Sequence, residues 1–187
     1  MGANEIQAQA QILFAKYGYE NTSLSFIAEE SGVKKQTIYS HFKSKEDLFH
    51  AVAESVSAQE CLYLSRFFAR DEPPFSLLQS FVLAMQKRLT DAEDTSARLI
   101  IRMIFEPSGV LAEQSPSQCP EYLHQLEHSL VSALIRQGIQ PPRARNLAAL
   151  TGTFLIGLFG ILVFVGQKPF ENKYLASLPV LEQLLKG

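Results

Sequence analysis

The chain has 187 residues, of which 47% are hydrophobic and 19% charged, and its formal net charge is -2. This composition can bury a sizeable core and excludes an intrinsically disordered protein, while the near-neutral charge excludes a surface coated in nucleic acid. Any contact with nucleic acid must therefore be local, and the length suits a small domain joined to a medium one.

The two cysteines, Cys61 and Cys119, lie far apart and have no neighbours at metal-ligand spacing. This pattern is typical of ordinary thiols in a reduced cytosolic protein. The first residues lack a basic stretch followed by an apolar run, so we expect no secretory signal. We therefore expect a cytoplasmic protein that carries no cofactor and no metal ion.

The N-terminal region reads as a series of short helices. Apolar residues recur at helical spacing over residues 6–17, and Gly18 ends that run. Thr22 and Ser23 offer caps for a short second helix that carries Ile27 inward. The sequence therefore predicts one amphipathic helix followed closely by a shorter one.

A turn and a third helix follow at once. Gly32 can adopt a positive φ without steric cost, and Val33 is expected to tuck back between the helices. The third helix should cover about residues 35–41, and Ser44 then begins a long helix with a pattern similar to a capping box. Two short helices joined by such a turn predict a helix-turn-helix motif.

The segment IAEESGVKKQTIYSHFKSKEDLF, residues 27–49, resembles the signature of the TetR family of bacterial transcriptional regulators nearly residue for residue. The shared pattern has a small residue where two helices cross, a glycine in the turn, and an aromatic pair before a capped lysine. The matching positions are Phe14, Gly18, Thr22, Ile27, Ala28, Gly32, Val33, Ile38, Tyr39, Phe42, Lys45 and Leu48. The strong resemblance covers residues 6 to about 52, and the rest is similar in length and helical pattern.

This resemblance to TetR/AcrR-like proteins implies an all-α fold of about nine helices. Residues 1–48 would form a three-helix DNA-binding domain, and residues 49–187 a ligand-binding and dimerisation domain. The expected function is that of a transcriptional regulator, not an enzyme, which binds a palindromic double-stranded operator as a homodimer and is released by a small apolar or aromatic effector. Repression is favoured over activation because a dimer on an operator blocks polymerase without any further contact surface.

The expected reading helix lies in the major groove while the helix before it crosses the backbone. Ile38 and Phe42 must face the core, which leaves the other residues of this segment accessible. Because no arginine precedes Arg66, a lysine would have to read guanine, and Gln36 suits adenine. Base readout is expected from Lys35, Gln36 and Thr37, within an accessible set of Lys34, Lys35, Gln36, Thr37, Ser40 and His41.

The family resemblance also implies phosphate contacts by Thr22, Tyr39, His41 and Lys45, which would set the register on the duplex. Two other interpretations stay open. Tyr39 could close the small domain as a half-buried aromatic residue, and the lysines could form an ordinary solvated face. The residues before the first helix include no arginine or lysine, so the sequence does not predict an N-terminal arm that contacts DNA.

Beyond this motif the chain has no repeat, no low-complexity tract and no linker long enough to separate independent domains. Proline and glycine clusters punctuate the remaining helices. The expected helices cover about residues 44–70, 77–89, 96–106, 120–136, 141–166 and 174–185.

Aromatic and methionine side chains on these helices are candidates for an effector pocket, which is usually apolar with a few polar groups. The same side chains could equally be ordinary core. Arg102 is the polar group expected to face inward, although an i, i+4 pair with Glu106 would explain it as well. The candidate effector-binding residues are Phe67, Phe81, Met85, Arg102, Met103 and Tyr122.

Residues 147–166 carry no charge over about one membrane thickness, so a transmembrane span must be weighed. Basic residues flank this segment on both sides, and no second span is present, which argues against one. A stripe of small side chains instead favours close helix packing in a homodimer. The predicted interface residues are Ala149, Thr153 and Gly157 on this helix and Leu178 and Leu181 on the last one.

One catalytic pattern offers an alternative function. His124, Glu127 and His128 match the inverted zinc-peptidase motif, with two histidines four residues apart. A catalytic zinc ion also needs a third protein ligand, and the sequence nominates none. The alternative to a DNA-binding regulator is therefore a helical metal-dependent hydrolase, which the sequence disfavours.

Overall fold

The computed structural model describes residues 2–106 and 118–186. These residues form helices and no strands, which confirms the all-α prediction. The prolines and glycine predicted to end the helix near residue 106 lie outside the described residues. The helices are α1 (Ala3–Tyr17), α2 (Leu24–Glu30), α3 (Lys35–Tyr39), α4 (Lys45–Phe68), α5 (Pro74–Thr90), α6 (Thr95–Phe105), α8 (Gln118–Arg136), α9 (Pro141–Phe164) and α10 (Gln167–Lys186).

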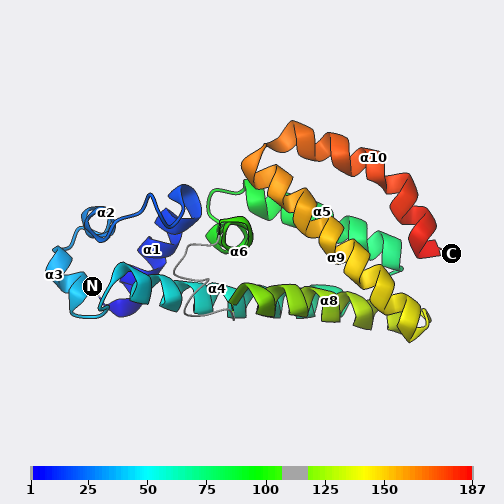
Figure 1. Ribbon diagram of the computed structural model, residues 1–187, viewed down its shortest axis with the longest axis horizontal. Coiled ribbons are helices and arrows are strands. Elements are labelled where there is room, and N and C mark those ends of the chain that lie inside the picture. The colour runs from blue at the N-terminus through cyan, green and yellow to red at the C-terminus, as the bar shows by residue number, and fades with distance from the viewer. Residues whose placement is uncertain (1, 107–117, 187) are drawn as a thin grey trace.

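The molecule is elongated, with α1 to α3 gathered at one end (Figure 1). We call these three helices the head and α4 to α10 the body. The long helix α4 begins beside the head and runs along the body next to α8, and α9 contacts α5, α6, α8 and α10. The expected domain boundary between residues 48 and 49 falls inside α4, so head and body share a continuous helix.

The last helix differs from its prediction. It begins at Gln167 rather than near residue 174, and Pro179 lies within it. Gly166, whose φ is +119°, allows the chain to reverse immediately after α9. The short connection leaves α10 long enough to pack along α9 and α5.

The head is held together by an apolar cluster that its three helices share with α4. Ile6, Ile27 and Ile38 are fully buried. The ring of Phe14 meets that of Phe49 edge-on at 4.9 Å, and Tyr19 lies 4.7 Å from Phe49. Because Phe49 belongs to α4, the head core is completed by the body's first helix.

A partly buried ion-pair network links three elements of the body. Arg88 at the end of α5 donates to both oxygens of Glu60 on α4, at 2.6 and 2.9 Å, and its Nε donates to Asp94 at 2.7 Å. Asp94 also caps α6 by accepting from the amide of Ala97. Burial alone lowers the pKa of Arg88, but the hydrogen bonds to Glu60 and Asp94 outweigh it, so the net pKa is raised and the guanidinium stays charged.

We expect Arg88→Leu to lower the free energy of unfolding by about 3 to 5 kcal/mol, because it leaves the carboxylate of Glu60 buried without its partner. Urea unfolding at one fixed protein concentration measures this loss. The double variant Glu60→Leu/Arg88→Leu should lose less free energy of unfolding than Arg88→Leu alone, because no unpaired charge is then left buried. Equal losses in the two variants would contradict this account of the network.

Candidate nucleic-acid interface

The helix-turn-helix is built by local hydrogen bonds and one buried anchor. Ser23, rather than Thr22, caps α2 by accepting from the amide of Phe26 at 3.1 Å. In the turn, Gly32 adopts a φ of +64°, and the amide of Val33 donates to the carbonyl of Ala28 at 3.0 Å. Ile38 is fully buried beneath α3, so the opposite face of this short helix is turned outward.

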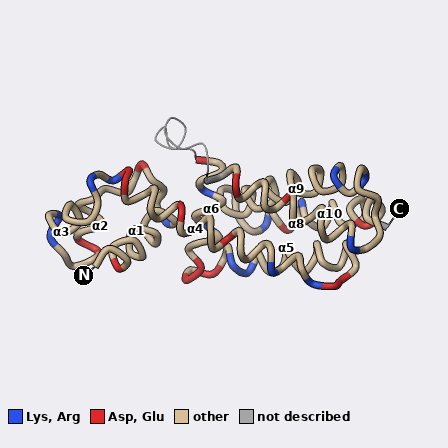
Figure 2. The backbone as a smooth tube through the Cα atoms, turned by 90° about the horizontal axis from the view of Figure 1, so that it is seen from below, with Lys and Arg blue, Asp and Glu red and all other residues tan. Residues whose placement is uncertain are grey.

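The outward face of α3 carries most of the residues predicted to contact DNA. Lys34, Lys35, Gln36, Tyr39, Ser40 and His41 are exposed, and Thr37 is half-buried. Tyr39 is 51% exposed, and the ammonium of Lys35 lies 5.8 Å from the centre of its ring. Figure 2 shows α3 and its lysines at the far end of the head, away from the body. The structure therefore brings these side chains together on one accessible surface.

Thr22 requires a correction. Its side chain is fully buried, and its hydroxyl donates to the carbonyl of Gly18 at 2.8 Å and weakly to that of Leu13 at 3.4 Å. The hydroxyl is therefore not placed to bind a phosphate. Instead it ties the chain that enters α2 to the end of α1.

Lys45 also has an internal role that the sequence did not reveal. Its ammonium donates to the carbonyl of Tyr19 at 2.9 Å and lies 3.9 Å from the centre of the Tyr19 ring. These contacts fasten the start of α4 to the connection after α1. The two residues are 26 positions apart, and no periodic pattern links them, so sequence reasoning had no signal for this pair.

The start of α4 follows the predicted capping pattern. Ser44 accepts from the amide of Asp47 at 3.1 Å, and Asp47 accepts from the amide of Lys43 at 2.8 Å.

Residues 1–48 contain five lysines but six carboxylates and no arginine. Three of the five lysines, Lys34, Lys35 and Lys43, lie within or close to α3 in the sequence, which suits local phosphate contacts better than broad non-specific binding.

The predicted effector-binding residues fall into two groups. Phe81, Met85, Met103 and Tyr122 are buried, and Phe67 is half-buried with its ring 5.2 Å from that of Phe81. These five side chains belong to the packed interior of the body. Tyr122 differs from the others because its buried hydroxyl has no hydrogen-bond partner among the described residues, and burial raises its pKa.

Arg102 does not face the interior with this group, which corrects the prediction. It forms the i, i+4 ion pair with Glu106 at 2.7 Å, and its guanidinium reaches the carbonyl of Lys16 on α1 at 3.4 Å. Of the two interpretations of this residue, the structure therefore supports the pair with Glu106.

The open surface of α9 carries the small residues predicted to form an interface. Ala149, Thr153 and Gly157 are all exposed, whereas Leu181 is buried within the protomer and Leu178 is half-buried. The prediction for Leu181 is therefore wrong in this structure. Large apolar residues that the sequence analysis did not select share the exposed surface of α9 and α10: Leu150, Phe164, Val165, Leu175, Val180 and Leu184.

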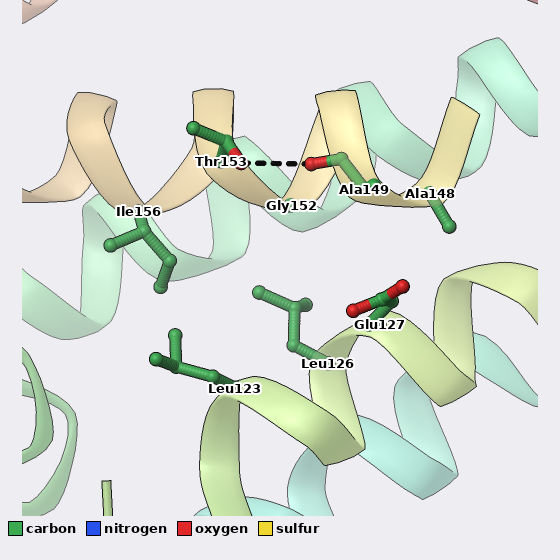
Figure 3. Close-up of a pocket in the computed structure, with 8 residues that line it drawn as sticks. All are labelled: Leu123, Leu126, Glu127, Ala148, Ala149, Gly152, Thr153 and Ile156. Carbon is green, nitrogen blue, oxygen red and sulfur yellow. Dashed lines mark hydrogen bonds between the residues drawn. The ribbon is translucent and has the colours of Figure 1, made fainter. Parts of the chain in front are cut away.

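Two grooves flank the small residues of α9. One, of about 280 Å³, lies between α8 and α9 and is lined by Leu123, Leu126 and Ile156, with Glu127 at its edge (Figure 3). The other, of about 430 Å³, lies between α9 and α10. Thr153 borders both grooves, so α9 forms a ridge between them.

Within the described residues, α9 is the one helix whose length and composition would allow it to span a membrane. Its contacts with α5, α6, α8 and α10 are those of a central helix in a bundle. The alternative metal site is not supported either. His124 and His128 are exposed, and no group of three or more His, Cys, Asp or Glu side chains in the described part of the chain could hold a metal ion.

Comparison with known proteins identifies this architecture. The family described as "Bacterial regulatory proteins, tetR family" matches residues 6–52. The HTH-type transcriptional regulator AcrR of Shigella flexneri is 29% identical over 83% of this chain and 75% of its own length. These similarities support assignment of the chain to the TetR family, whose model matches residues 6–52. The repressor ComR of Escherichia coli is 41% identical, over 34% of this chain and 27% of its own length.

Solved structures agree with the fold of this chain. A TetR regulator from Legionella pneumophila has a TM-score of 0.73 at 22% identity and covers 97% of this chain and 95% of its own. A TetR-family regulator from Agrobacterium tumefaciens has a TM-score of 0.75 at 18% identity, covering 97% and 96%. The curated relatives are transcriptional regulators and not enzymes, so the hydrolase alternative has no support.

In the head, we expect Thr22→Val to lower the free energy of unfolding by about 1 to 2 kcal/mol, because a buried hydroxyl and its hydrogen bonds are lost. Urea unfolding measures the change. Thr22→Ser, which keeps the hydroxyl, is the matched control and should lose less free energy of unfolding than Thr22→Val. A Thr22→Val protein with unchanged stability would contradict the structural role assigned to this side chain.

Proposed function

We propose that this TetR-family regulator is a cytoplasmic repressor that binds a palindromic operator through α3. The observation that carries the proposal is the outward face of α3, where accessible lysines and Gln36 lie above the buried anchor Ile38. Bases would be read by Lys35, Gln36 and Thr37 in the major groove. Tyr39, Ser40 and His41 lie beside them, where phosphate contacts would set the register. The likeness of part of the chain to the repressor ComR supports repression.

The proposal includes a homodimer, because one short reading helix covers only a few base pairs and two-fold symmetry doubles the contact. The exposed small residues of α9 permit close approach of a second α9, and exposed apolar residues of this helix such as Leu150 gain from burial. The DNA-binding domain, residues 1–48, would then comprise the head and the first residues of α4, and residues 49–187 would form the ligand-binding and dimerisation domain.

The proposal also includes release from DNA by a small apolar or aromatic effector. Two features of the interior support this part: the rings of Phe67 and Phe81 pack together, and the buried hydroxyl of Tyr122 has no hydrogen-bond partner among the described residues. A ligand with a hydrogen-bonding group could satisfy that hydroxyl.

The deciding measurement is fluorescence anisotropy of the protein with a labelled duplex from upstream of its own gene, against a scrambled duplex, at roughly 150 mM salt. We expect saturable binding to the first duplex only. Lys35→Ala should weaken binding, and it should reduce the slope of log affinity against log salt by about 2, since each head of the dimer loses one phosphate or base-edge charge. Lys87→Ala, on the exposed side of α5, is the matched control and should bind as wild type. Displacement of the duplex by apolar compounds in this assay tests the effector part.

Equal weak binding to both duplexes, followed by failure of selection from genomic fragments to enrich any site, would overturn the DNA-binding proposal. Loss of affinity in Lys87→Ala as large as that in Lys35→Ala would show that α3 is not the reading helix.

Dimerisation has its own test. We expect Thr153→Glu to convert the dimer to a monomer in sedimentation velocity, because two carboxylates would meet next to the symmetry axis of a close helix contact. Lys87→Glu introduces a carboxylate elsewhere on the body and should remain dimeric. A Thr153→Glu protein that sediments as a dimer would place the interface on a different face.

A further inference from the structure

The helix α6 is the part of the body that is packed most directly on both the head and α9. It contacts α1 along its length, and it also contacts α4, α5, α8 and α9. Head and body are also connected by α4, which contacts α1 and completes the head core through Phe49. The position of α6 therefore bears on how the head is oriented relative to α9.

The first turn of α6 is tied to the head by a polar contact. The side-chain amide of Gln11 on α1 donates to the hydroxyls of Thr95 and Ser96, at 2.8 and 2.9 Å. Ser96 in turn donates to Gln59 of α4 at 3.2 Å. This end of α6 is therefore held against the middle of α1.

The last turn of α6 is held to the C-terminal end of α1. The guanidinium of Arg102 reaches the carbonyl of Lys16 at 3.4 Å, where the unpaired carbonyls of a helix end favour a cation. The contact is close enough that a Cβ added at Gly18 would lie 3.2 Å from the carboxylate of Glu106. Since α6 is attached at both ends, α6 and the head should move as one body.

The same last turn of α6 lies directly on α9. A Cβ added at Gly160 would lie 2.6 Å from Cζ of Phe105, so the ring of Phe105 occupies the space that any larger residue would need. This ring also meets that of Phe164 at 5.8 Å, and the guanidinium of Arg102 lies 5.6 Å from the Phe164 ring centre. One turn of α6 thus joins the end of α1 to the helix proposed to form the dimer.

We propose that Phe105 and Gly160 are positioning residues that set the spacing between the two reading helices, and thereby the half-site spacing that the dimer prefers. The inference rests on the proposed function, because it concerns two heads on one operator. Glycine at position 160 lets α6 approach α9 closely, and that approach fixes the angle of the attached head. Because α3 lies at the far end of the head from this contact (Figure 1), a small rotation here moves α3 by a larger distance.

The contact can be altered without emptying the core. Phe105 is 45% exposed, so a methyl group at position 160 can push its ring outward instead of breaking buried packing. Gly152 on the same helix provides a matched control, since a Cβ there would lie 3.8 Å from Leu130, an ordinary contact distance. The pair of substitutions Gly160→Ala and Gly152→Ala therefore separates the contact with α6 from the general effect of alanine in α9.

The experiment selects duplexes from a random library with the full-length protein and then measures affinity on duplexes with the selected half-sites and stepped spacers. Each added base pair moves the half-sites apart by about 3.4 Å and rotates them by roughly a tenth of a turn. We expect Gly160→Ala to prefer a spacer different from that of wild type by one or more base pairs, with about tenfold weaker binding at the wild-type spacer. Gly152→Ala should keep the wild-type preference, and both variants should unfold at urea concentrations close to wild type.

A double-variant cycle gives a second, independent readout. Once Phe105→Ala has removed the ring, the added methyl group has nothing to displace, so Gly160→Ala should cause no further change in spacer preference. The inference is overturned if Gly160→Ala keeps the wild-type spacer, if it loses affinity equally at all spacers, or if its effect is the same with and without Phe105. If the wild-type protein selects no two-part site, both the proposed function and this inference are overturned. This outcome is distinguishable from failure of the inference alone, because it appears with the wild-type protein before any variant is tested.

Discussion

A reading helix of five residues has no stability of its own, because a single helical turn does not recover the entropy lost in forming it. The orientation of α3 therefore depends on the burial of Ile38 and Phe42 in a core that the head cannot complete alone. Phe49, from the first helix of the body, supplies the missing face of that core. The proposed recognition of DNA by α3 thus depends on the continuous helix α4, and the head is not an independent module attached by a linker.

The helices of the body also depend on one another for their positions. The buried carboxylate of Glu60 on α4 is neutralised by Arg88 of α5, which also holds Asp94, the residue that caps α6. Helix α6 then contacts the head at both of its ends and α9 at one. A change at the centre of the body is therefore connected to α3 through packed and ion-paired elements, as the proposed release from DNA by an effector would require.

Several residues play roles that their type and family position did not suggest. Thr22 and Lys45 match the family pattern, yet the first is buried and the second is hydrogen-bonded to Tyr19 inside the head. Arg102 was expected to point into the interior but lies against the end of α1. In each case the partner is a backbone carbonyl at a helix end or in a connection, and such acceptors leave no periodic trace in a sequence.

The sequence by itself determined the all-α fold, the helix-turn-helix over residues 6–52 and the accessible set on α3, because these follow from local periodicity, caps, a glycine turn and a specific motif. It also determined the small-residue stripe of α9, which helical spacing alone places on one face. Only the tertiary structure decided that Leu181 points inward and that Phe105 rests on Gly160 of a helix more than fifty residues away. These outcomes depend on which faces of distant helices meet, and that is set by the packing of the whole bundle, not by any segment of it.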